Sequence, residues 1–197
     1  MSRPIILAST SPYRRELLQR LVPAFAVHPS GVDEEQQSGE SPQAMTRRLA
    51  LAKAQAVARR FPDAVVIGSD QTATLDDLQS IAKPETLDRA RAQLRAASGQ
   101  TMRFHTALAV VCLAHGIRQI EVVDTVVQFR VLDDASIEHY LAREPALDCV
   151  GAAKCEALGI ALMASIASSD PTALIGLPLI ALTRMLRDAG VDVLALR

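Results

Sequence analysis

The stretch Val65-Val66-Ile67-Gly68-Ser69-Asp70-Gln71 is an apolar run that ends abruptly in a charge. Its β-branched residues predict a buried strand, and the carboxylate at the exit needs a partner because an unpaired buried charge is costly. In open α/β sheets, ligands bind in the crevice beyond the carboxyl ends of the strands. Gly68 would let a substrate or metal approach the backbone closely. Asp70 is therefore a candidate for the centre of a functional site, with an ordinary capping aspartate as the alternative.

The composition predicts a folded globular protein without a strong charge bias. The 197 residues are 49% hydrophobic and 22% charged, enough for one domain with a substantial core or for two small lobes. A net charge of -1 offers no basic excess for nucleic acid. No apolar run reaches the roughly 18 residues of a membrane span, and the apolar run near the start is too short to predict a signal peptide. Three cysteines without a CxxC pair indicate a reducing compartment. We expect one cytoplasmic domain over residues 1–197, without membrane or stable nucleic-acid partners.

Strand and helix patterns alternate along the chain. Strand patterns cover residues 4–8, 25–27, 65–71, 101–113, 117–132 and 158–166. Helix patterns cover residues 13–21, 42–60, 86–99, a segment after Asp133-Asp134, and a segment from Pro178 to Gly190. The two long strands form a hairpin signal around Ala114-His115-Gly116. The alternation predicts an α/β protein with a curved mixed β-sheet, flanking helices, and two lobes around a cleft.

The first strand, loop and helix form the best candidate anion site. Ser9, Thr10 and Ser11 supply hydroxyl groups just before a helix N-terminus, which offers free N–H groups and a positive dipole. Arg14 and Arg15 fall in the first helical turn, where cations oppose the dipole. Two arginines are sensible there if an anion such as a polyphosphate binds between them. The alternative is that both are solvated.

Two carboxylates and two lysines from separate segments complete the candidate set. Glu34 and Asp70 could hold Mg²⁺ through oxygen ligands, or either could act as general base on an attacking water. The alternative for Glu34 is a solvated acidic loop. Lys53 stands at the edge of an apolar helix row, where it either snorkels into solvent or reaches a phosphate. Lys83 projects from a loop that Pro84 holds extended, and it either binds phosphate or is exposed.

Together these segments resemble the Maf family of nucleotide pyrophosphatases. The resemblance rests on blocks in the family's order, at residues 7–18, 32–34, 53–54, 67–71, 83–84, 140–151 and 176–179. It implies a metal-dependent cytoplasmic hydrolase with an inosine-triphosphatase-like fold, often a homodimer. Such enzymes cut the α–β phosphoanhydride of a nucleoside triphosphate, with Mg²⁺ as the expected metal and Mn²⁺ or Co²⁺ as alternatives. Asp70 matches the catalytic carboxylate. The positions that match phosphate or metal handling are Ser9, Arg14, Glu34, Lys53 and Lys83.

The subgroup decides the expected substrate. Gln71, the block at residues 151–160 and Asp170-Pro171 are similar to the 7-methyl-GTP pyrophosphatases, and differ from the dTTP/UTP subgroup. Tyr13, Gln71 and Glu156 match positions associated with base selection. 7-Methylguanine carries a positive charge that an aromatic ring attracts, and a carboxylate could accept from the guanine N–H donors. The alternative is that Tyr13 packs on its helix and Glu156 is solvated.

Three residues depart from the subgroup's pattern, and three functions follow as hypotheses. Tyr13 replaces a frequent Trp, Ala82 replaces the glycine before Lys83, and Ala153 stands where an aromatic residue is usual. The leading hypothesis is a 7-methyl-GTP pyrophosphatase. The alternatives are a dTTP/UTP pyrophosphatase and a non-catalytic nucleotide-binding regulator of septation, the process for which the family is named.

Overall fold

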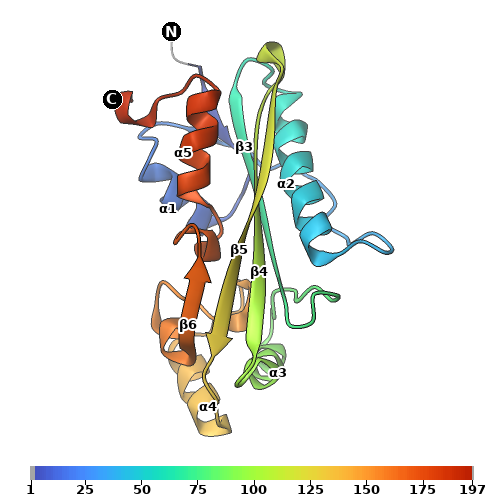
Figure 1. Ribbon diagram of the computed structural model, residues 1–197, viewed down its shortest axis with the longest axis vertical. Coiled ribbons are helices and arrows are strands. Elements are labelled where there is room, and N and C mark those ends of the chain that lie inside the picture. Colours follow the sequence, from blue (N-terminus) through green and yellow to red (C-terminus); the bar gives the residue numbers. More distant parts are fainter. Residues whose placement is uncertain (1–2, 197) are drawn as a thin grey trace.

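The computed structural model describes residues 3–196 and contains one six-stranded sheet that runs through the length of the molecule (Figure 1). The strands are β1 (Ile5–Leu7), β2 (Ala26–Val27), β3 (Val65–Thr74), β4 (Thr101–Cys112), β5 (Ile117–Phe129) and β6 (Met163–Ser168). Their order is β2-β1-β3-β4-β5-β6. β1 pairs in parallel with β2 and β3, whereas β3, β4, β5 and β6 pair antiparallel. The prediction of an α/β protein with a mixed sheet is confirmed.

Five α-helices flank this sheet in the described part of the chain. They are α1 (Pro12–Gln19), α2 (Pro42–Ala58), α3 (Leu87–Ala97), α4 (Asp134–Arg143) and α5 (Leu179–Asp188). Four begin at caps whose side chains accept a backbone N–H, namely Ser11, Ser41, Thr86 and Asp133. Short 3₁₀ helices lie at Leu113–His115, Val150–Ala152, Leu158–Leu162, Ala173–Ile175 and Val193–Ala195. Within residues 3–196, no helix is both long and apolar enough to cross a bilayer.

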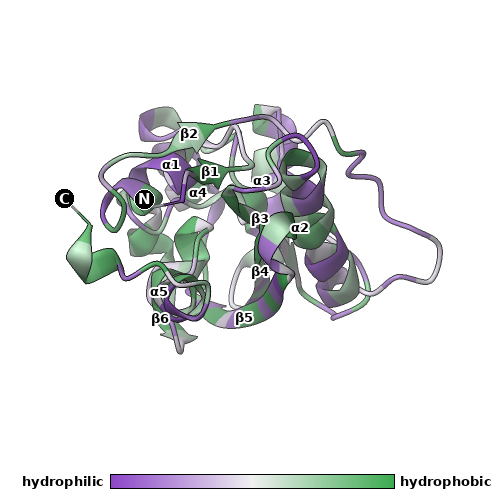
Figure 2. Cartoon of the chain, turned by 90° about the horizontal axis from the view of Figure 1, so that it is seen from above, coloured by the Kyte–Doolittle hydropathy of each residue, from purple (hydrophilic) through white to green (hydrophobic). Residues whose placement is uncertain are grey.

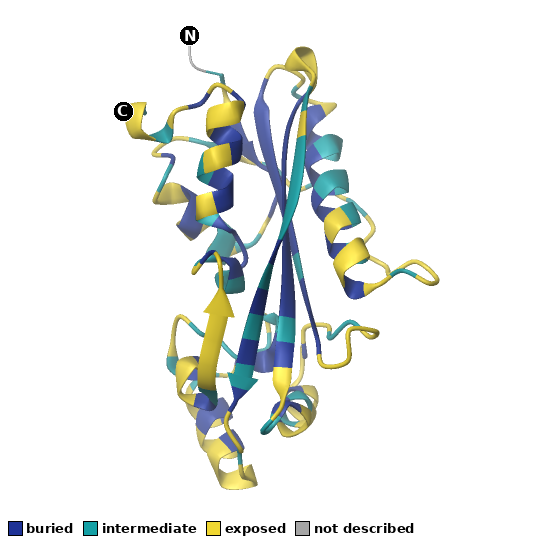
Figure 3. Ribbon diagram, in the orientation of Figure 1, coloured by how far each residue is buried: buried dark blue, intermediate teal, exposed yellow. Residues whose placement is uncertain are grey.

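The buried apolar residues form three clusters around the long strands, of which β3 and β4 are mostly dark blue in Figure 3. In the first cluster, α1 and α5 pack on one face of the sheet. In the second, α3 and α4 pack at the other end of the long strands. In the third, α2 covers the opposite face. In Figure 2, β5 alternates between hydrophobic and hydrophilic bands, as expected for a strand with one face on a core.

The backbone of α2 packs directly against Gly68 of β3. A Cβ atom placed there would lie 2.4 Å from the carbonyl oxygen of Ala50 and 2.7 Å from the amide nitrogen of Ala54. The expectation that a substrate or metal approaches Gly68 is therefore wrong, since the backbone of α2 fills that space. Asp70 lies two residues further along the same face of β3, inside the strand and not at its exit as the sequence predicts, because β3 continues to Thr74. The close packing at Gly68 brings α2 and its Lys53 to the carboxylate.

The apolar segment before β6 differs from its prediction. The sequence predicts one strand over residues 158–166, whereas the chain forms a 3₁₀ helix at Leu158–Leu162 and a strand only from Met163. A Cβ atom on Gly159 would lie 2.5 Å from the amide nitrogen of Lys154. The chain therefore folds back on itself at Gly159, where its backbone lies against that of Lys154 and not in an extended strand.

Candidate active site

A pocket of about 430 Å³ opens where α1, α2 and the middle of β3 meet, within the roughly 300–1,000 Å³ of small-molecule sites. Its walls come from residues 8–14, residues 29–32, Glu34, Lys53, Asp70, Gln71, Lys83, residues 148–150 and residues 175–176. The pocket therefore combines segments that are far apart in the sequence.

The structure brings most of the candidate residues from the sequence into this pocket. Those that line it are Ser9, Tyr13, Arg14, Glu34, Lys53, Asp70, Gln71 and Lys83. Arg15 and Glu156 are exposed and lie outside the lining. Arg15 follows Arg14 by about 100° around α1, so the two arginines do not face the same space. Glu156 lies beside its neighbour Cys155, with 3.5 Å between the Cys155 Sγ and the carboxylate.

Lys53 holds two carboxylates together at the centre of the pocket. Its Nζ lies 2.7 Å from Asp70 Oδ1 and 2.7 Å from Glu34 Oε1. Lys53 is 5% exposed and Asp70 is 6% exposed, so the lysine does not snorkel into solvent. Burial raises the pKa of Asp70 above its ordinary value, and the charges of Lys53 and Arg14 only partly offset this effect. A carboxylate with a raised pKa is suited to accept a proton from water.

The same two carboxylates offer a partial metal site. Their oxygens converge on a single cation, the Lys53 ammonium, and oxygen ligands are the kind that Mg²⁺ prefers. Among residues 3–196, no three His, Cys, Asp or Glu side chains are grouped to hold a metal ion by themselves. Glu34 and Asp70 therefore fit a cation whose remaining ligands are phosphate oxygens and water, as is usual for Mg²⁺ in phosphate sites.

Arg14 is anchored from the opposite side of the pocket by Gly176. Its Nε donates to the Gly176 carbonyl oxygen at 2.9 Å, and the hydroxyl of Ser69 donates to the same oxygen at 2.9 Å. Burial lowers the pKa of Arg14, while the charges of Asp70 and Glu34 raise it, and a guanidinium stays protonated through such shifts. Gly176 has a φ of 120°, which favours glycine. This contact directs a fixed positive charge toward Asp70.

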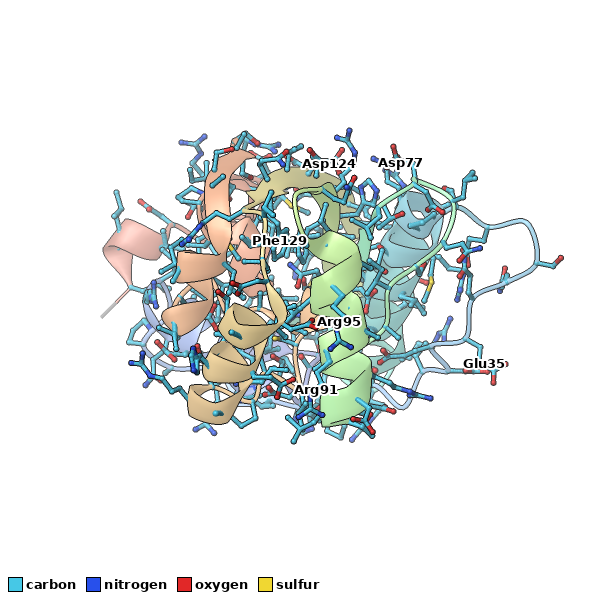
Figure 4. All side chains as sticks on the ribbon, turned by 90° about the horizontal axis from the view of Figure 1, so that it is seen from below. Glu35, Asp77, Arg91, Arg95, Asp124 and Phe129 are labelled. Carbon is cyan, nitrogen blue, oxygen red and sulfur yellow. The ribbon has the colours of Figure 1, made fainter. Side chains whose placement is uncertain are left out.

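A second arginine fixes the loop that carries Glu34. Arg48 on α2 donates to both carboxylate oxygens of Glu40, at 2.7 and 2.8 Å, and to the Glu35 carbonyl oxygen at 2.9 Å. Figure 4 shows Glu35 on the loop that extends to the side of the molecule. Because α2 supplies both Arg48 and Lys53, one helix positions the loop and contacts its carboxylate.

Tyr13 and Asp148 form another part of the wall. The Tyr13 hydroxyl donates to Asp148 Oδ2 at 2.7 Å, and the Lys154 Nζ lies 3.1 Å from Asp148 Oδ1. Burial raises the pKa of Asp148, but the hydrogen bonds from Tyr13 and Lys154 outweigh it and the pKa lies below the ordinary value. Burial raises the pKa of the neighbouring Cys149 thiol to about 12, so it is not a thiolate nucleophile at neutral pH.

Gln71 is held tightly on its side of the pocket. Its Nε2 donates to Thr106 Oγ1 at 2.9 Å and to the carbonyl oxygens of Ala173 and Leu174, both at 3.0 Å. Because these acceptors engage the amide nitrogen, the carbonyl oxygen is the end of the side chain that Gln71 offers to a ligand.

The sequence profile described as Maf-like protein matches residues 4–189 of this chain. The chain belongs to the Maf family. It is 56% identical over 194 residues to a protein of Polaromonas sp. (strain JS666 / ATCC BAA-500) named 7-methyl-GTP pyrophosphatase, with 98% of this chain and 88% of that protein covered. A protein of the same name from Xanthomonas axonopodis pv. citri (strain 306) is 56% identical over 190 residues, covering 96% of this chain and 98% of that protein. The solved structure of the Staphylococcus aureus Ham1 protein is similar over 66% of this chain and 73% of its own, with 14% identity and a TM-score of 0.45.

Two residues of this Maf pocket, Asp148 and Gly176, and Arg48 outside its lining were given no role from the sequence. Asp148 acts through its contact to Tyr13 and Gly176 through its contact to Arg14, both far along the chain, whereas Arg48 contacts the nearby Glu35 and Glu40. Asp148 lies in the block of residues 140–151 that resembles the family, and a charged residue in that block was the signal that could have indicated a functional role. Gly176 also lies in a shared block, residues 176–179, but that block does not indicate a contact to Arg14, and Arg48 lies in none of the shared blocks.

The raised pKa of Asp70 can be measured directly in the metal-free protein. We expect the carboxyl carbon of Asp70 to titrate above the ordinary value of 3.8, because burial favours its protonated form. Asp133, whose carboxylate accepts the Ser136 amide at a helix start, should titrate below 3.8 in the same experiment. Glu34→Gln should lower the pKa of Asp70, because the Glu34 charge raises it. Carbon-13 NMR with Asp70→Asn for assignment measures all three, and an Asp70 that titrates at or below 3.8 would refute the effect of burial.

Proposed function

We propose that this Maf-family protein hydrolyses the α–β phosphoanhydride of 7-methyl-GTP, using one water to give 7-methyl-GMP and diphosphate. Relatives named 7-methyl-GTP pyrophosphatase, 56% identical over nearly the whole chain, support the substrate. The observation that carries the chemistry is the buried Asp70–Lys53 pair, which the exposed Glu34 joins through Lys53, beside Arg14 in one pocket. The pocket thus contains positive side chains that can bind a polyphosphate and carboxylates that can bind a metal ion and a water molecule.

The positive side chains bind and orient the triphosphate. Arg14, Lys53 and Lys83 line the same pocket as the N-terminal end of α1, to which Ser9 adds a hydroxyl. Hydrolysis of a phosphoanhydride develops negative charge on the departing oxygens, and fixed positive groups stabilise this charge without having to reorganise. The anchor from Gly176 keeps Arg14 in place for this task.

Asp70 acts on the attacking water. Its raised pKa makes it a better proton acceptor than an ordinary aspartate, and Lys53 holds it in position. Glu34 and Asp70 would also hold a divalent cation, with Mg²⁺ proposed first and Mn²⁺ or Co²⁺ as alternatives. Such an ion supplies charge neutralisation at the phosphate oxygens. The bond between the α-phosphorus and the bridging oxygen breaks, and the electron pair leaves with diphosphate.

The test is diphosphate release from 7-methyl-GTP, GTP, dTTP, UTP, CTP and ITP with Mg²⁺. We expect kcat/KM to be highest for 7-methyl-GTP by about tenfold, equivalent to about 1.4 kcal/mol of transition-state binding. A chelator should abolish release and added Mg²⁺ should restore it. A preference for dTTP or UTP would support the alternative substrate class. Nucleotide binding without any release would instead support the non-catalytic regulator.

We also propose that the protein acts as a single domain in the cytoplasm. The free thiols Cys112, Cys149 and Cys155 support a reducing compartment such as the cytoplasm. The sheet that joins all three apolar clusters supports a single domain over residues 1–197. The homodimer expected from the family resemblance stays a prediction.

A further inference from the structure

One carboxylate in the pocket wall is not used by the phosphate chemistry. Asp148 does not belong to the group around Lys53, and it lies next to residues of the second apolar cluster, Cys149 and Val150. Its two oxygens face different partners, Tyr13 at 2.7 Å and Lys154 at 3.1 Å. Asp148 keeps 55% of its side-chain surface exposed, so a ligand in the pocket can reach it.

Lys154 contacts both halves of this wall. Its Nζ lies 5.6 Å from the centroid of the Tyr13 ring, within the roughly 6 Å of a cation–π contact, and it is ion-paired with Asp148. The protein's own cation therefore uses an aromatic face and a carboxylate that are hydrogen-bonded to each other. A planar ligand with a positive charge would be attracted by the same two groups.

We propose that Tyr13 and Asp148 form a subsite that selects the positively charged base of a 7-methylated purine nucleotide, and that Lys154 competes with this base for them. The inference deepens the proposed function and rests on it for the choice of ligand. It assigns to Asp148 the role of acidic base reader that the sequence suggested for Glu156. Glu156 is exposed and does not line the pocket, whereas Asp148 does.

The charge of the base is the property that this subsite reads. GTP and 7-methyl-GTP share their donors at N1 and the 2-amino group, so hydrogen bonding to these donors cannot separate them. They differ in the methyl group and in the positive charge that it brings. The Tyr13 ring and the Asp148 carboxylate, which are hydrogen-bonded to each other, attract a positively charged base more strongly than a neutral one. The subsite therefore favours 7-methylguanine over guanine.

Binding of the products 7-methyl-GMP and GMP to the metal-free protein tests the inference without requiring turnover. Isothermal titration should be run at a pH below the N1 ionisation of 7-methylguanine, so that the base keeps its full charge. We expect wild-type protein to bind 7-methyl-GMP about fivefold more tightly than GMP, corresponding to about 1 kcal/mol. Asp148→Asn keeps the shape of the side chain and should remove this preference.

Lys154→Met provides a second variant with the opposite expected effect. It keeps a long apolar side chain but removes the competing cation, so the preference for 7-methyl-GMP should rise above that of the wild type. Asp188→Asn, at an exposed aspartate outside the pocket, is the matched loss of charge and should leave the ratio unchanged.

Each outcome separates the inference from the proposed function. Equal binding of the two products by wild-type protein, or an unchanged ratio in Asp148→Asn, would overturn the subsite. A lower ratio in Lys154→Met would overturn the competition by Lys154. If wild-type protein prefers 7-methyl-GMP but releases no diphosphate from any nucleotide, the proposed hydrolysis fails while the subsite stands.

Discussion

Replacement of Asp70 by asparagine is expected to reduce diphosphate release about a thousandfold or more while the protein stays folded. Asparagine has the same shape and keeps an oxygen that can accept from Lys53, but it cannot take a proton and is a poor metal ligand. Burial favours the uncharged form of Asp70, so a neutral side chain is not penalised at this site. Lys53 retains Glu34 as a charged partner in the variant.

The loss of activity must be separated from a loss of structure. Single-turnover hydrolysis of 7-methyl-GTP measures the chemical step, and thermal unfolding of the same samples measures stability. Asp63→Asn is the matched control, because Asp63 is exposed and stands just ahead of β3, outside the pocket. Wild-type turnover in Asp70→Asn would remove Asp70 from the chemistry, whatever its place in the pocket.

Gly68→Ala is expected to destabilise the protein by about 3 kcal/mol, the upper end of the usual cost of overpacking. The new methyl group would meet the Ala50 carbonyl oxygen at 2.4 Å and the Ala54 amide nitrogen at 2.7 Å. Both are backbone atoms of α2, so no rotation of a side chain can relieve the contact. The helix would have to move away from β3, and this would also separate Lys53 from Asp70.

Urea unfolding measures the change in stability, and diphosphate release measures the separation of Lys53 from Asp70. Gly39→Ala is the matched control, since nothing lies within 4 Å of the added Cβ and only its φ of +75° opposes the substitution. That strain costs about 1 kcal/mol, so the control should unfold at a higher urea concentration than Gly68→Ala. If the two variants have equal stability, α2 does not pack as closely on β3 as described.

The parts of the fold that depend on local sequence could be predicted. The caps Ser11, Ser41, Thr86 and Asp133 start their helices because a side-chain oxygen close in sequence satisfies a free N–H group. The hairpin of β4 and β5 follows from two long apolar runs around a short turn. Asp70 and Lys53 were found by the mismatch between a charge and its apolar surroundings, a signal that is also local.

The rest of the site depends on contacts between distant segments. Tyr13 and Asp148 are 135 positions apart, and nothing near either residue in the sequence indicates the other. Glu156 was assigned to the base from its resemblance to the family, but its side chain is exposed and lies outside the pocket lining. Arg15 was proposed together with Arg14, and helix geometry directs the two side chains differently.

The walls of the pocket rest on separate apolar clusters, and this arrangement has a consequence for how the family can diversify. The Asp70–Lys53 pair depends on α2 and the third cluster, whereas Asp148 adjoins residues of the second cluster. Substitutions at distant, independently packed positions have nearly additive effects. Substitutions around Asp148 are therefore expected to leave the packing of the Asp70–Lys53 pair in place, so that the proposed base subsite can vary in descendants while the hydrolytic pair is kept.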